Sequence, residues 1–567
     1  MSSAMRILLV SRPHPEGARD PFTSLMPTGL GYLNAILREN GFASSLANLS
    51  GASWHQVEEL LRRERPAILG ISVFTHNRFE SLRVAALAKK VDPACLTVFG
   101  GPHATNDFES ILTNHREVDA VVLGEGEETF LDLARTIAQG GRNLTGLAGL
   151  AFRQGTKVYN AMRPPVADLD ALPPPAMHMD DAWGCDVRRQ LEFIITSRGC
   201  PAACRFCSSP RFWGKALRFR SPRAMVDEIL TIRDRYGLIY FSLRDDTFTV
   251  RKERVIEFCQ LLLEEKIHIL WNCQSRVNAV DEEMLIWMRR AGCECVQYGV
   301  ESGSERVLAY LGKGVTAEQV RMAAGMTRRA GLNLSIYLIT GVPGETCEDL
   351  QATLALINDI LPHDGHVAPL AYYPGTALFN EAVREGKVKA DLFERERGEA
   401  LYVRSDPFVA RSAETLLRAL TRVGNKARFG PADFTAQRRL LGYCHGTNLA
   451  QGGWLEGKGD WGKAAALYGE IIERQPENSW GWLALGGLHG SRGDLVQAEK
   501  AFEQVVKIVP AHVPAYLALG DLRLEEGDRR GALQRYETAR RLSPRDPDVV
   551  ERLRMITSGR GRKKGDT

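Results

Sequence analysis

Short apolar runs alternate with amphipathic segments over the first 140 residues of the chain. The runs MRILLVS, AILGISVF and LTVFGG have the length and the continuous hydrophobicity of buried strands. The segments GLGYLNAILRENG and SLRVAALAKKV repeat apolar residues at helical spacing, and DAVVLGEGEETFLDLARTI changes from a strand pattern to a helical one. Apolar strands separated by helices favour a parallel sheet that is covered on both faces. We therefore predict a doubly wound α/β domain over residues 1–150.

A second alternating stretch occupies residues 189–385, after a proline-rich linker over 151–188. Six strand candidates follow one another with amphipathic helices between them: LEFIITSRG, LIYFSLRDD, ILWNCQSRV, CVQYGVESG, LNLSIYLITG and HVAPLAYYPG. Six βα units predict a partial (β/α)6 barrel, because a closed barrel of this kind has eight strands. Residues 386–445 are charged and helical in pattern, and we interpret them as a helical extension.

An internal repeat of 34 residues begins near residue 446. Gly-Asp pairs start at positions 459, 493 and 527, and prolines recur at 476, 510 and 544. The middle copy fits the tetratricopeptide pattern with Trp482, Leu485, Gly486, Ala498, Phe502 and Pro510. We predict an all-α tetratricopeptide-repeat region over 446–556, followed by a disordered basic tail over 557–567.

Composition excludes several classes of protein. The formal net charge is only +4, from 73 basic and 69 acidic residues, and gives no reason to invoke nucleic acid or an anionic membrane. No stretch has the roughly 18 apolar residues of a membrane span, and the amino-terminal run is too short for a secretory signal. We therefore expect a cytoplasmic protein, in which the 11 cysteines are reduced rather than paired in disulfides.

The spacing of three cysteines carries the most specific chemical signal. In CPAACRFCSS, Cys200, Cys204 and Cys207 follow directly after a predicted strand. Three thiolates in one short loop can hold three irons of a [4Fe–4S] cubane, and the fourth iron then has no protein ligand. An open position on a metal is a place for chemistry, whereas a structural site is normally closed. The other cysteines show no second cluster spacing.

The cysteine motif, with Phe206 before the third cysteine, resembles the signature of the radical S-adenosylmethionine (SAM) superfamily over residues 189–385. The resemblance implies that SAM chelates the open iron and that one electron cleaves it to methionine and a 5′-deoxyadenosyl radical, which abstracts a hydrogen from the substrate. LRDDTFT, QSRV, GVESGSERVL and GVPGET resemble SAM-contacting segments at the ends of later strands. The implied SAM-binding residues are Phe206, Asp245, Asp246, Arg276, Glu301, Ser302, Gly341 and Gly344.

The first domain resembles the Rossmann-like cobalamin (B12)-binding domain that precedes the barrel in a large group of these enzymes. A small hydroxyl residue and a glycine pair close neighbouring strands in SVF and GG, as in sheets that admit a flat, phosphate-bearing cofactor. The segments GGPHAT and LGEGEET complete the resemblance. The implied cobalamin-binding residues are Ser72, Gly100, Gly101, His103, Gly124, Glu125 and Gly126.

The loop after the first strand departs from the motif of the related base-off cobalamin domains. That motif has an aspartate, a histidine that is the lower cobalt ligand, and a glycine. In RPHPEG, His14 and Gly17 fit, but Arg12 stands where the aspartate would orient the imidazole. We do not expect His14 to be a ligand, and the sequence leaves the lower ligand open. It also identifies no catalytic acid or base.

The resemblance implies a cobalamin-dependent radical SAM enzyme, most often a methyltransferase in this group, which methylates an unactivated carbon through methylcobalamin. Radical cyclisation or rearrangement without methyl transfer is the main alternative. A methylthiotransferase would need a second cluster in the first domain, where residues 1–150 contain only Cys95. A non-catalytic cobalamin scaffold is a distant alternative, because the cysteine motif is intact.

The expected partners follow from the same interpretation. An electron donor of the flavodoxin or ferredoxin type would reduce the cluster, and the repeats suggest a protein partner. They are equally consistent with a packing extension of the catalytic core. The sequence does not identify the substrate, which is a small molecule or a peptide.

Overall fold

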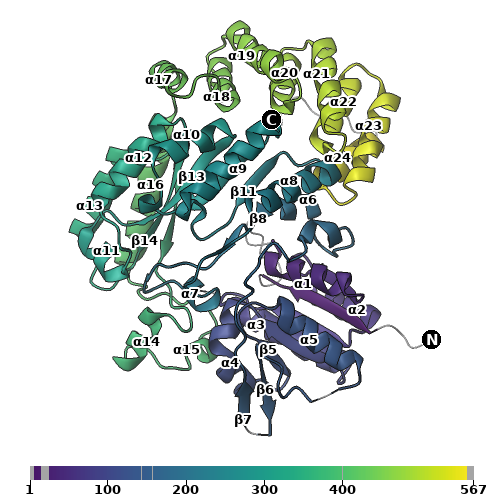
Figure 1. Cartoon of the computed structure of the whole chain (residues 1–567), viewed down its shortest axis with the longest axis vertical. Helices are drawn as coiled ribbons and strands as arrows, with labels where there is room; N and C mark the ends of the chain where they lie inside the picture. Colours follow the sequence, from purple (N-terminus) through teal and green to yellow (C-terminus); the bar gives the residue numbers. More distant parts are fainter. Residues whose placement is uncertain (1–4, 14–24, 142, 156, 399, 558–567) are drawn as a thin grey trace.

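The computed structural model describes residues 5–13, 25–141, 143–155, 157–398 and 400–557. A first α/β domain lies at one end of the molecule, a barrel of strands and helices occupies the middle, and an arch of helices covers the other end (Figure 1). The predicted α/β multidomain fold class is thereby confirmed.

The first domain is built on one seven-stranded sheet in the order β2-β1-β3-β4-β5-β6-β7. Its parallel part has the strand reversal of a doubly wound sheet beside β1, and β6 and β7 add an antiparallel edge. The strands are β1 (Arg6–Ser11), β2 (Ala43–Asn48), β3 (Ile68–Ser72), β4 (Leu96–Gly100), β5 (Ala120–Val122), β6 (Leu150–Gln154) and β7 (Lys157–Asn160). The helices are α1 (Thr28–Glu39), α2 (Trp54–Glu64), α3 (Arg78–Val91), α4 (Pro102–Asn114) and α5 (Glu127–Ala138).

Three strands of this sheet have no counterpart among the strands predicted from the sequence. β2 reads ASSLAN and lacks a continuous apolar run because it forms one edge of the sheet. The short β6–β7 hairpin forms the other edge and carries the sheet to residue 160, beyond the predicted boundary at 150. The sequence of β2 mixes polar with apolar residues, β6 has only three consecutive apolar residues and β7 reads KVYN, so none of the three shows the longer apolar run of a central strand.

The second domain is a partial barrel of six parallel strands in the order β15-β14-β13-β12-β11-β8. All six coincide with strand candidates of the sequence: β8 (Phe193–Ile194), β11 (Tyr240–Leu243), β12 (Leu270–Ser275), β13 (Cys293–Glu301), β14 (Asn333–Thr340) and β15 (Asp364–Pro369). The connecting helices are α8 (Pro222–Tyr236), α9 (Lys252–Glu264), α10 (Glu282–Arg290), α11 (Glu305–Leu311), α12 (Ala317–Arg329) and α13 (Cys347–Ile360).

The outer face of the barrel sheet carries its hydrophobic core. Alternate residues of the four strands β11 to β14, such as Phe241, Trp271, Val296 and Ile336, are buried in one large cluster together with residues of the surrounding helices. This period of two follows from the pleat of a strand, in which successive side chains point to opposite faces.

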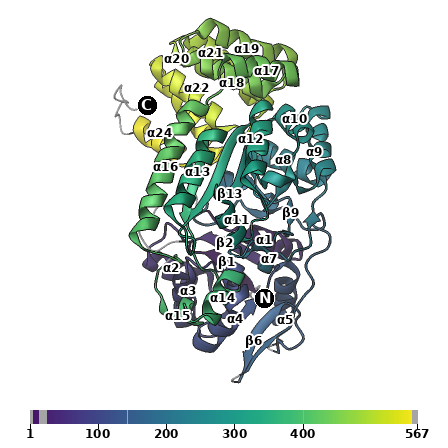
Figure 2. The same cartoon turned by 90° about the vertical axis from the view of Figure 1, so that its left-hand side faces the viewer.

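The helical extension links all parts of the molecule. α16 (Pro407–Ala427) packs against β15 and lies beside α13 (Figure 2), and α17 (Pro431–Leu441) leads into the repeats. The short helix α15 (Leu392–Arg395) returns to the first domain, where Arg78 Nε donates to the Phe393 carbonyl at 2.8 Å. Glu394 accepts from Ser110 at 2.8 Å and lies 2.8 Å from His115 Nε2, so this segment ties the extension to α4.

The repeats form an arch of helix pairs, which ends near α6 (Val187–Leu191) and α8 (Figure 1). Their helices are α18 (His445–Glu456), α19 (Trp461–Arg474), α20 (Ser479–Ser491), α21 (Leu495–Ile508), α22 (Val513–Glu525), α23 (Arg529–Leu542) and α24 (Pro547–Thr557). Pattern residues pack within each pair: Gly486 lies against the Phe502 ring and Gly520 against the Tyr536 ring. Glycine is required at these two positions because a Cβ would lie about 2.9 Å or less from the ring carbons.

The repeats contact the barrel at the rim where its strands begin. The contacts come from the loops between successive helix pairs, which lie along one edge of the arch. Glu477 Oε1 lies 3.1 Å from His268 Nε2, just before β12. Ala511, one period later, packs its carbonyl against Gly237 before β11. Arg545, one further period along, donates to the Ala182 carbonyl at 2.6 Å.

The same edge is extended in both directions. Cys444 Sγ donates to the Arg289 carbonyl at 3.5 Å, before β13, and Asp546 pairs with Arg188 at 3.3 Å, before β8. Four consecutive turns of the arch thus meet the entries of four neighbouring strands. The opposite rim, where the strands end, stays free for chemistry. Within the described residues, no helix is both long enough and apolar enough to cross a bilayer.

Substituting Gly237 tests the docking of the repeats. Gly237 has φ +69°, and a Cβ there would lie 2.1 Å from the Ala511 carbonyl oxygen. Gly386 has nearly the same φ, +70°, with open space around it, so Gly386→Ala carries only the backbone cost of about 1–2 kcal/mol. We expect Gly237→Ala to lower the thermal unfolding midpoint further than Gly386→Ala and to speed tryptic cleavage within the repeats. Equal behaviour of the two variants would contradict the rim contact.

Candidate functional site

The predicted cluster cysteines lie in one loop whose two ends are held together by a short antiparallel pair, β9 (Ser197–Arg198) and β10 (Arg218–Phe219). Gly199 opens the loop with φ +97°, and a Cβ there would lie 2.1 Å from the Ala216 carbonyl oxygen. The loop can therefore close only with glycine at this position. Cys200 follows Gly199, and a hydrogen bond from its N–H to the Gly214 carbonyl at 3.3 Å also holds the loop closed.

The three thiols of the loop lie within electrostatic reach of one another. Burial, together with the nearby Asp246, Cys204 and Cys200, raises the pKa of Cys207 to about 11. Burial likewise raises the pKa of Cys200. A thiolate in these positions therefore needs a cation beside it, which an iron cluster provides.

The donor set fits a cubane better than a single metal ion. No group of three or more His, Cys, Asp or Glu side chains in the described part of the chain could hold one metal ion. The thiolates of a cubane bind different irons, so they surround the cluster without meeting at a point. Arg276 Nη1 donates to Cys204 Sγ at 3.6 Å, as expected for a group that lies beside a cluster sulfur.

The structure separates the two adjacent aspartates after β11. Asp245 is 1% exposed and accepts four hydrogen bonds, from the N–H and hydroxyl groups of Thr196 and Ser197, at 2.5–3.0 Å. It therefore fixes the strand that leads into the cysteine loop. Asp246 is exposed, accepts from the Ser209 hydroxyl and acts electrostatically on Cys200 and Cys207. Of the two, only Asp246 faces the predicted cluster.

The end of β13 is joined to the cluster loop by a lysine that the sequence analysis missed. Glu301 follows a bulge in β13, has φ +67° and pairs with Lys313 Nζ at 2.7 Å. Both side chains are buried, and the Lys313 carbonyl accepts from Arg276 Nη2. Arg276, Lys313 and Glu301 thus form one chain of contacts from Cys204 to β13. Phe206 packs with the apolar cluster that includes Val307, under the same rim.

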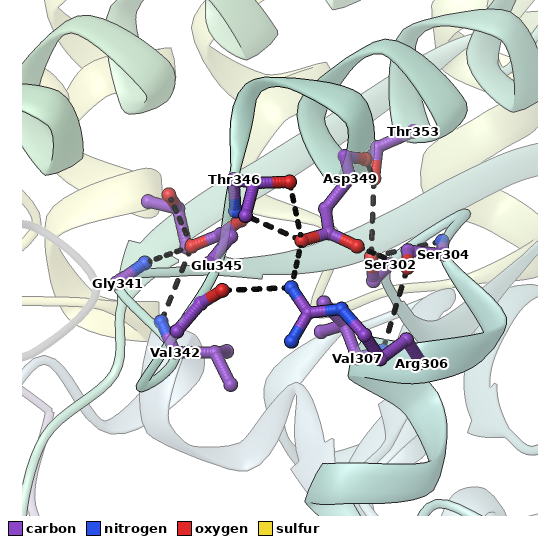
Figure 3. Close-up of polar contacts among 12 residues, drawn as sticks. Ser302, Ser304, Arg306, Val307, Gly341, Val342, Glu345, Thr346, Asp349 and Thr353 are labelled. Atoms are coloured by element: carbon purple, nitrogen blue, oxygen red, sulfur yellow. Dashed lines mark hydrogen bonds and ion pairs between the residues drawn. The ribbon is translucent and has the colours of Figure 1, made fainter.

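Two predicted SAM segments are bound to each other at the ends of β13 and β14 (Figure 3). The Glu345 carboxylate accepts from the N–H groups of Gly341 at 2.6 Å and Val342 at 3.2 Å, which fixes the GVPGET turn. Gly341 and Gly344 have φ of +81° and +74°, so the turn requires glycine there.

A carboxylate on α13 connects this turn to the GVESGS segment. Asp349 accepts from Ser304 Oγ at 2.6 Å and from Arg306, which also donates to the Gly344 carbonyl at 2.7 Å (Figure 3). Burial opposes the charge, but hydrogen bonds from Ser304, Arg306 and Thr346 lower the pKa of Asp349 to about 2. Ser302 is buried and lies 3.1 Å from Thr353 Oγ1, so its hydroxyl also belongs to this network.

Six of the seven predicted cobalamin residues line one cavity of about 250 Å³ at the carboxyl ends of β3, β4 and β5: Ser72, Gly100, Gly101, Gly124, Glu125 and Gly126. The remaining wall is mostly apolar, as a flat ring system requires. Gly101 has φ +97°, and a Cβ there would lie 2.9 Å from the Val73 carbonyl oxygen. Phe212 and Trp213, only a few residues after Cys207, close the cavity from the barrel side.

Glu125 also belongs to a group of buried charges between the two domains. The interdomain charge cluster consists of Glu125 and Glu127 from the first domain and Arg198 and Arg218 from the β9–β10 pair. Arg198 lies 3.0 Å from Glu125 and 2.6 Å from Glu127, and Arg218 Nη1 lies 2.9 Å from Glu125 Oε2. Although burial disfavours the guanidinium charge, the two glutamates raise the pKa of Arg198.

His103, the seventh predicted cobalamin residue, does not line the cavity. His103 is 3% exposed, lies 3.1 Å from Thr75 Oγ1 and packs edge-on against Phe393. Burial lowers its pKa to about 3, so the imidazole is neutral. Its contact with the corrin stays a prediction. His14 and Gly17 lie outside the described residues, and Arg12 donates to the Leu49 and Ala52 carbonyls.

Comparisons with known proteins agree with this arrangement. The Radical SAM superfamily profile matches residues 194–357, the B12 binding domain profile matches 22–134, and tetratricopeptide repeats match 455–519 and 490–554. An uncharacterized methyltransferase of Pyrococcus horikoshii is 32% identical over 385 residues, which cover 67% of this chain and 83% of that protein.

Two further relatives extend the comparison. An anaerobic magnesium-protoporphyrin IX monomethyl ester cyclase of Rubrivivax gelatinosus is 29% identical over 388 residues, 66% of this chain and 70% of the cyclase. The radical S-adenosylmethionine methyltransferase TsrM from Kitasatospora setae, solved with cobalamin and a [4Fe–4S] cluster bound, has a TM-score of 0.58 at 19% identity. That match covers 68% of this chain and 78% of TsrM, and shows that the fold is shared.

Removing one member tests the interdomain charge cluster. Arg198→Met leaves the buried Glu127 without a counter-charge and leaves Glu125 paired with Arg218 alone. This lowers the free energy of unfolding by about 3–5 kcal/mol. We expect a lower thermal midpoint and faster proteolysis between the domains. Arg418→Met, which removes an arginine from an exposed ion pair with Glu414, is the matched control and should change little. If both variants behave like the unchanged protein, the buried charges do not hold the domains together.

Proposed function

Because this chain belongs to the radical SAM superfamily, and within it to the enzymes that carry an amino-terminal B12-binding domain, we propose that it transfers a methyl group to an unactivated carbon of its substrate. The cofactors of this enzyme are a [4Fe–4S] cluster, SAM and cobalamin. The cluster supplies the electron that cleaves SAM, and cobalamin supplies the methyl group.

One observation carries the proposal. The loop with Cys200, Cys204 and Cys207 continues through α7 (Ser209–Phe212), and Phe212 and Trp213 form a wall of the cavity in the first domain. The predicted cluster ligands and the predicted cobalamin site therefore share a single short segment. Radical formation and methyl transfer act on the same substrate, so both cofactors must lie close to it. The short segment that joins the two predicted sites supports such an arrangement.

The roles of individual residues follow from their positions, and we propose them on that basis. Asp246 would accept a hydrogen bond from the amino group of SAM, since the Asp245 carboxylate already accepts from Thr196 and Ser197. Arg276 lies beside Cys204 and pairs with the carboxylate of SAM. The GVPGET turn presents backbone to the adenosine, while Phe212 and Trp213 exclude water from the cobalamin side.

Radical cyclisation is the second candidate function. The cyclase of Rubrivivax gelatinosus is nearly as similar to this chain as the methyltransferase, over nearly the same share of it. The two functions use the same cofactors and differ in what becomes of the substrate radical. Methyl-deuterated SAM separates them, because only a methyltransferase gives a product that carries the label.

The partners and the location belong to the same proposal. The repeats indicate a protein interaction, and we propose an electron donor of the flavodoxin or ferredoxin type for the cluster. All 11 cysteines are free, which favours a reducing compartment such as the cytoplasm.

The assignment of the cluster is tested by Cys204→Ala. With two thiolates left, the cluster cannot keep three irons bound and one open, so we expect loss of the absorbance near 400 nm and of 5′-deoxyadenosine formation. Cys347→Ala, which changes an exposed cysteine at the start of α13, should keep both. Near-normal 5′-deoxyadenosine formation by Cys204→Ala would overturn the assignment.

The assignment of the cobalamin cavity is tested by Gly100→Leu. Gly100 lines the cavity, and its Cβ position is free of contacts closer than 3.9 Å, so a larger side chain projects there without backbone strain. We expect loss of bound cobalamin, read from its visible spectrum, with the cluster retained. Gly51→Leu, at an open surface site of the same domain, is the control. Cobalamin bound equally by both variants would place it elsewhere.

A further inference from the structure

A layer of connected side chains crosses the barrel between its two rims, one for each strand: Phe193, Arg244, Gln274, Gln297, Tyr337 and His366. Arg244 and the Tyr337 hydroxyl both donate to Gln297 Oε1, at 3.3 and 3.0 Å. Gln274 donates to the Tyr337 hydroxyl at 3.4 Å. The Arg244 guanidinium lies over the Phe193 ring, and the histidine of β15 stacks on Tyr337. Together these contacts span the sheet from β8 to β15 and divide the interior of the barrel.

A cavity of about 580 Å³ lies on the side of this layer away from the cysteine loop. Its wall contains residues at or near the starts of five strands: Tyr240, Asn272, Glu294, Cys295, Asn333 and Asp364. Of the layer, only Gln297 belongs to the wall. A strand rises about 3.3 Å per residue, so Asn333 at the start of β14 lies roughly 23 Å from Thr340 at its end. The cavity is therefore a compartment apart from the predicted SAM and cobalamin sites.

The cavity opens where the repeats leave the barrel uncovered. The contacts of the arch described above lie before β13, β12, β11 and β8. The cavity lies at the entries of the two remaining strands, β14 and β15, where Asn333 and the exposed Asp364 line it. The facing wall is the last part of α16 and the exposed Arg428 that follows it. A small molecule can therefore enter from solvent without passing the cluster.

One side of the cavity is negative. The Glu294 carboxylate accepts from the Tyr240 hydroxyl at 2.6 Å. Asp364 forms no ion pair with any residue that the structure describes. Burial raises the pKa of the Cys295 thiol well above its ordinary value, and the charges of Asp364 and Glu294 act in the same direction. Two carboxylates that both act on one thiol are close enough to attract the same cationic ligand.

The other side of the cavity offers hydrogen-bond donors. Arg428 has no ion pair within the described part of the chain, and the next residue, Phe429, packs on the His363 ring with centroids 4.9 Å apart. Burial and the nearby Arg328 charge lower the pKa of His363 to about 4, so its imidazole is neutral. His363 Nδ1 accepts the Leu334 N–H at 3.0 Å, which places the hydrogen on Nε2. This N–H is buried without an acceptor among the described residues, which is unfavourable unless a ligand supplies one.

From these features we infer that the cavity at the start of the barrel binds a small molecule other than the substrate, and that this molecule is a basic amino acid. Its carboxylate pairs with Arg428 and accepts from His363. Its two ammonium groups lie toward Glu294 and Asp364. The charges are complementary, because two carboxylates and one guanidinium meet two ammonium groups and one carboxylate. The inference goes beyond the proposed function and does not depend on it.

Binding of simple amino acids to the reconstituted holoenzyme tests the inference without turnover. Equilibrium dialysis is carried out without a reductant and with SAM in excess, so that the SAM site is filled. We expect one L-lysine to bind per chain. L-Norleucine, which lacks the second ammonium group, and cadaverine, which lacks the carboxylate, should each bind at least roughly tenfold more weakly. Equal binding of lysine and norleucine, displacement of lysine by SAM, or no lysine binding overturns the inference.

Variants locate the binding. Asp364→Asn and Arg428→Met should each weaken lysine binding by roughly tenfold. The matched controls Asp359→Asn on α13 and Arg418→Met on α16 each remove an exposed charge of the same kind outside the cavity, and should bind lysine normally. Cluster and cobalamin spectra of the same samples report folding. Unchanged lysine binding by either Asp364→Asn or Arg428→Met overturns the inference.

The separation of the cavity from the chemistry has its own readout. Asp364→Asn and Arg428→Met should both retain 5′-deoxyadenosine formation from SAM, because the layer of side chains lies between the cavity and the cysteine loop. Loss of 5′-deoxyadenosine formation in folded samples of both variants would show that the cavity belongs to the active site and overturn the inference.

Discussion

The buried pairing of Glu125 and Glu127 with Arg198 and Arg218 is the interaction on which the rest of the site depends. Each charge would be strongly unfavourable in the interface alone, so the first domain and the cysteine loop must meet in one orientation that satisfies all four. Because Arg198 stands two residues before Cys200, this orientation also sets the position of the predicted cluster. Because Glu125 lines the cavity below β5, the same pairing fixes the wall of the cobalamin site.

The main features of the fold could be predicted from the sequence because they depend on local hydrophobicity. All six barrel strands can be predicted as strand candidates between amphipathic helices, and the 34-residue period predicts the repeats. The strands β2, β6 and β7 cannot be predicted in this way, since their sequences ASSLAN, LAFRQ and KVYN contain no long apolar run. Cavity residues such as Ser72, Gly100 and Gly101 can be predicted from SVF and GG, because a glycine at the end of a strand leaves room for a cofactor. This signal can be read from a single sequence.

The remaining features depend on contacts between distant segments, for which the sequence has no signal. Nothing in DD distinguishes Asp245 from Asp246; only the donors of Thr196 and Ser197, almost fifty residues away, assign the first a structural role. In the sequence, nothing distinguishes Lys313 and Arg198 from other basic residues, because the glutamates that they pair with come from other segments.

The seating of the repeats on the barrel has a consequence for how such a protein can change over time. Free solenoids gain and lose copies readily, because each unit needs only its neighbours. Here each turn of the arch meets the entry of a particular strand, from Cys444 to Asp546. Copy number is therefore tied to the circumference of another domain, and an inserted or deleted unit would shift every later turn off its strand. The spacing of the barrel strands therefore sets both the period and the number of repeats that can dock.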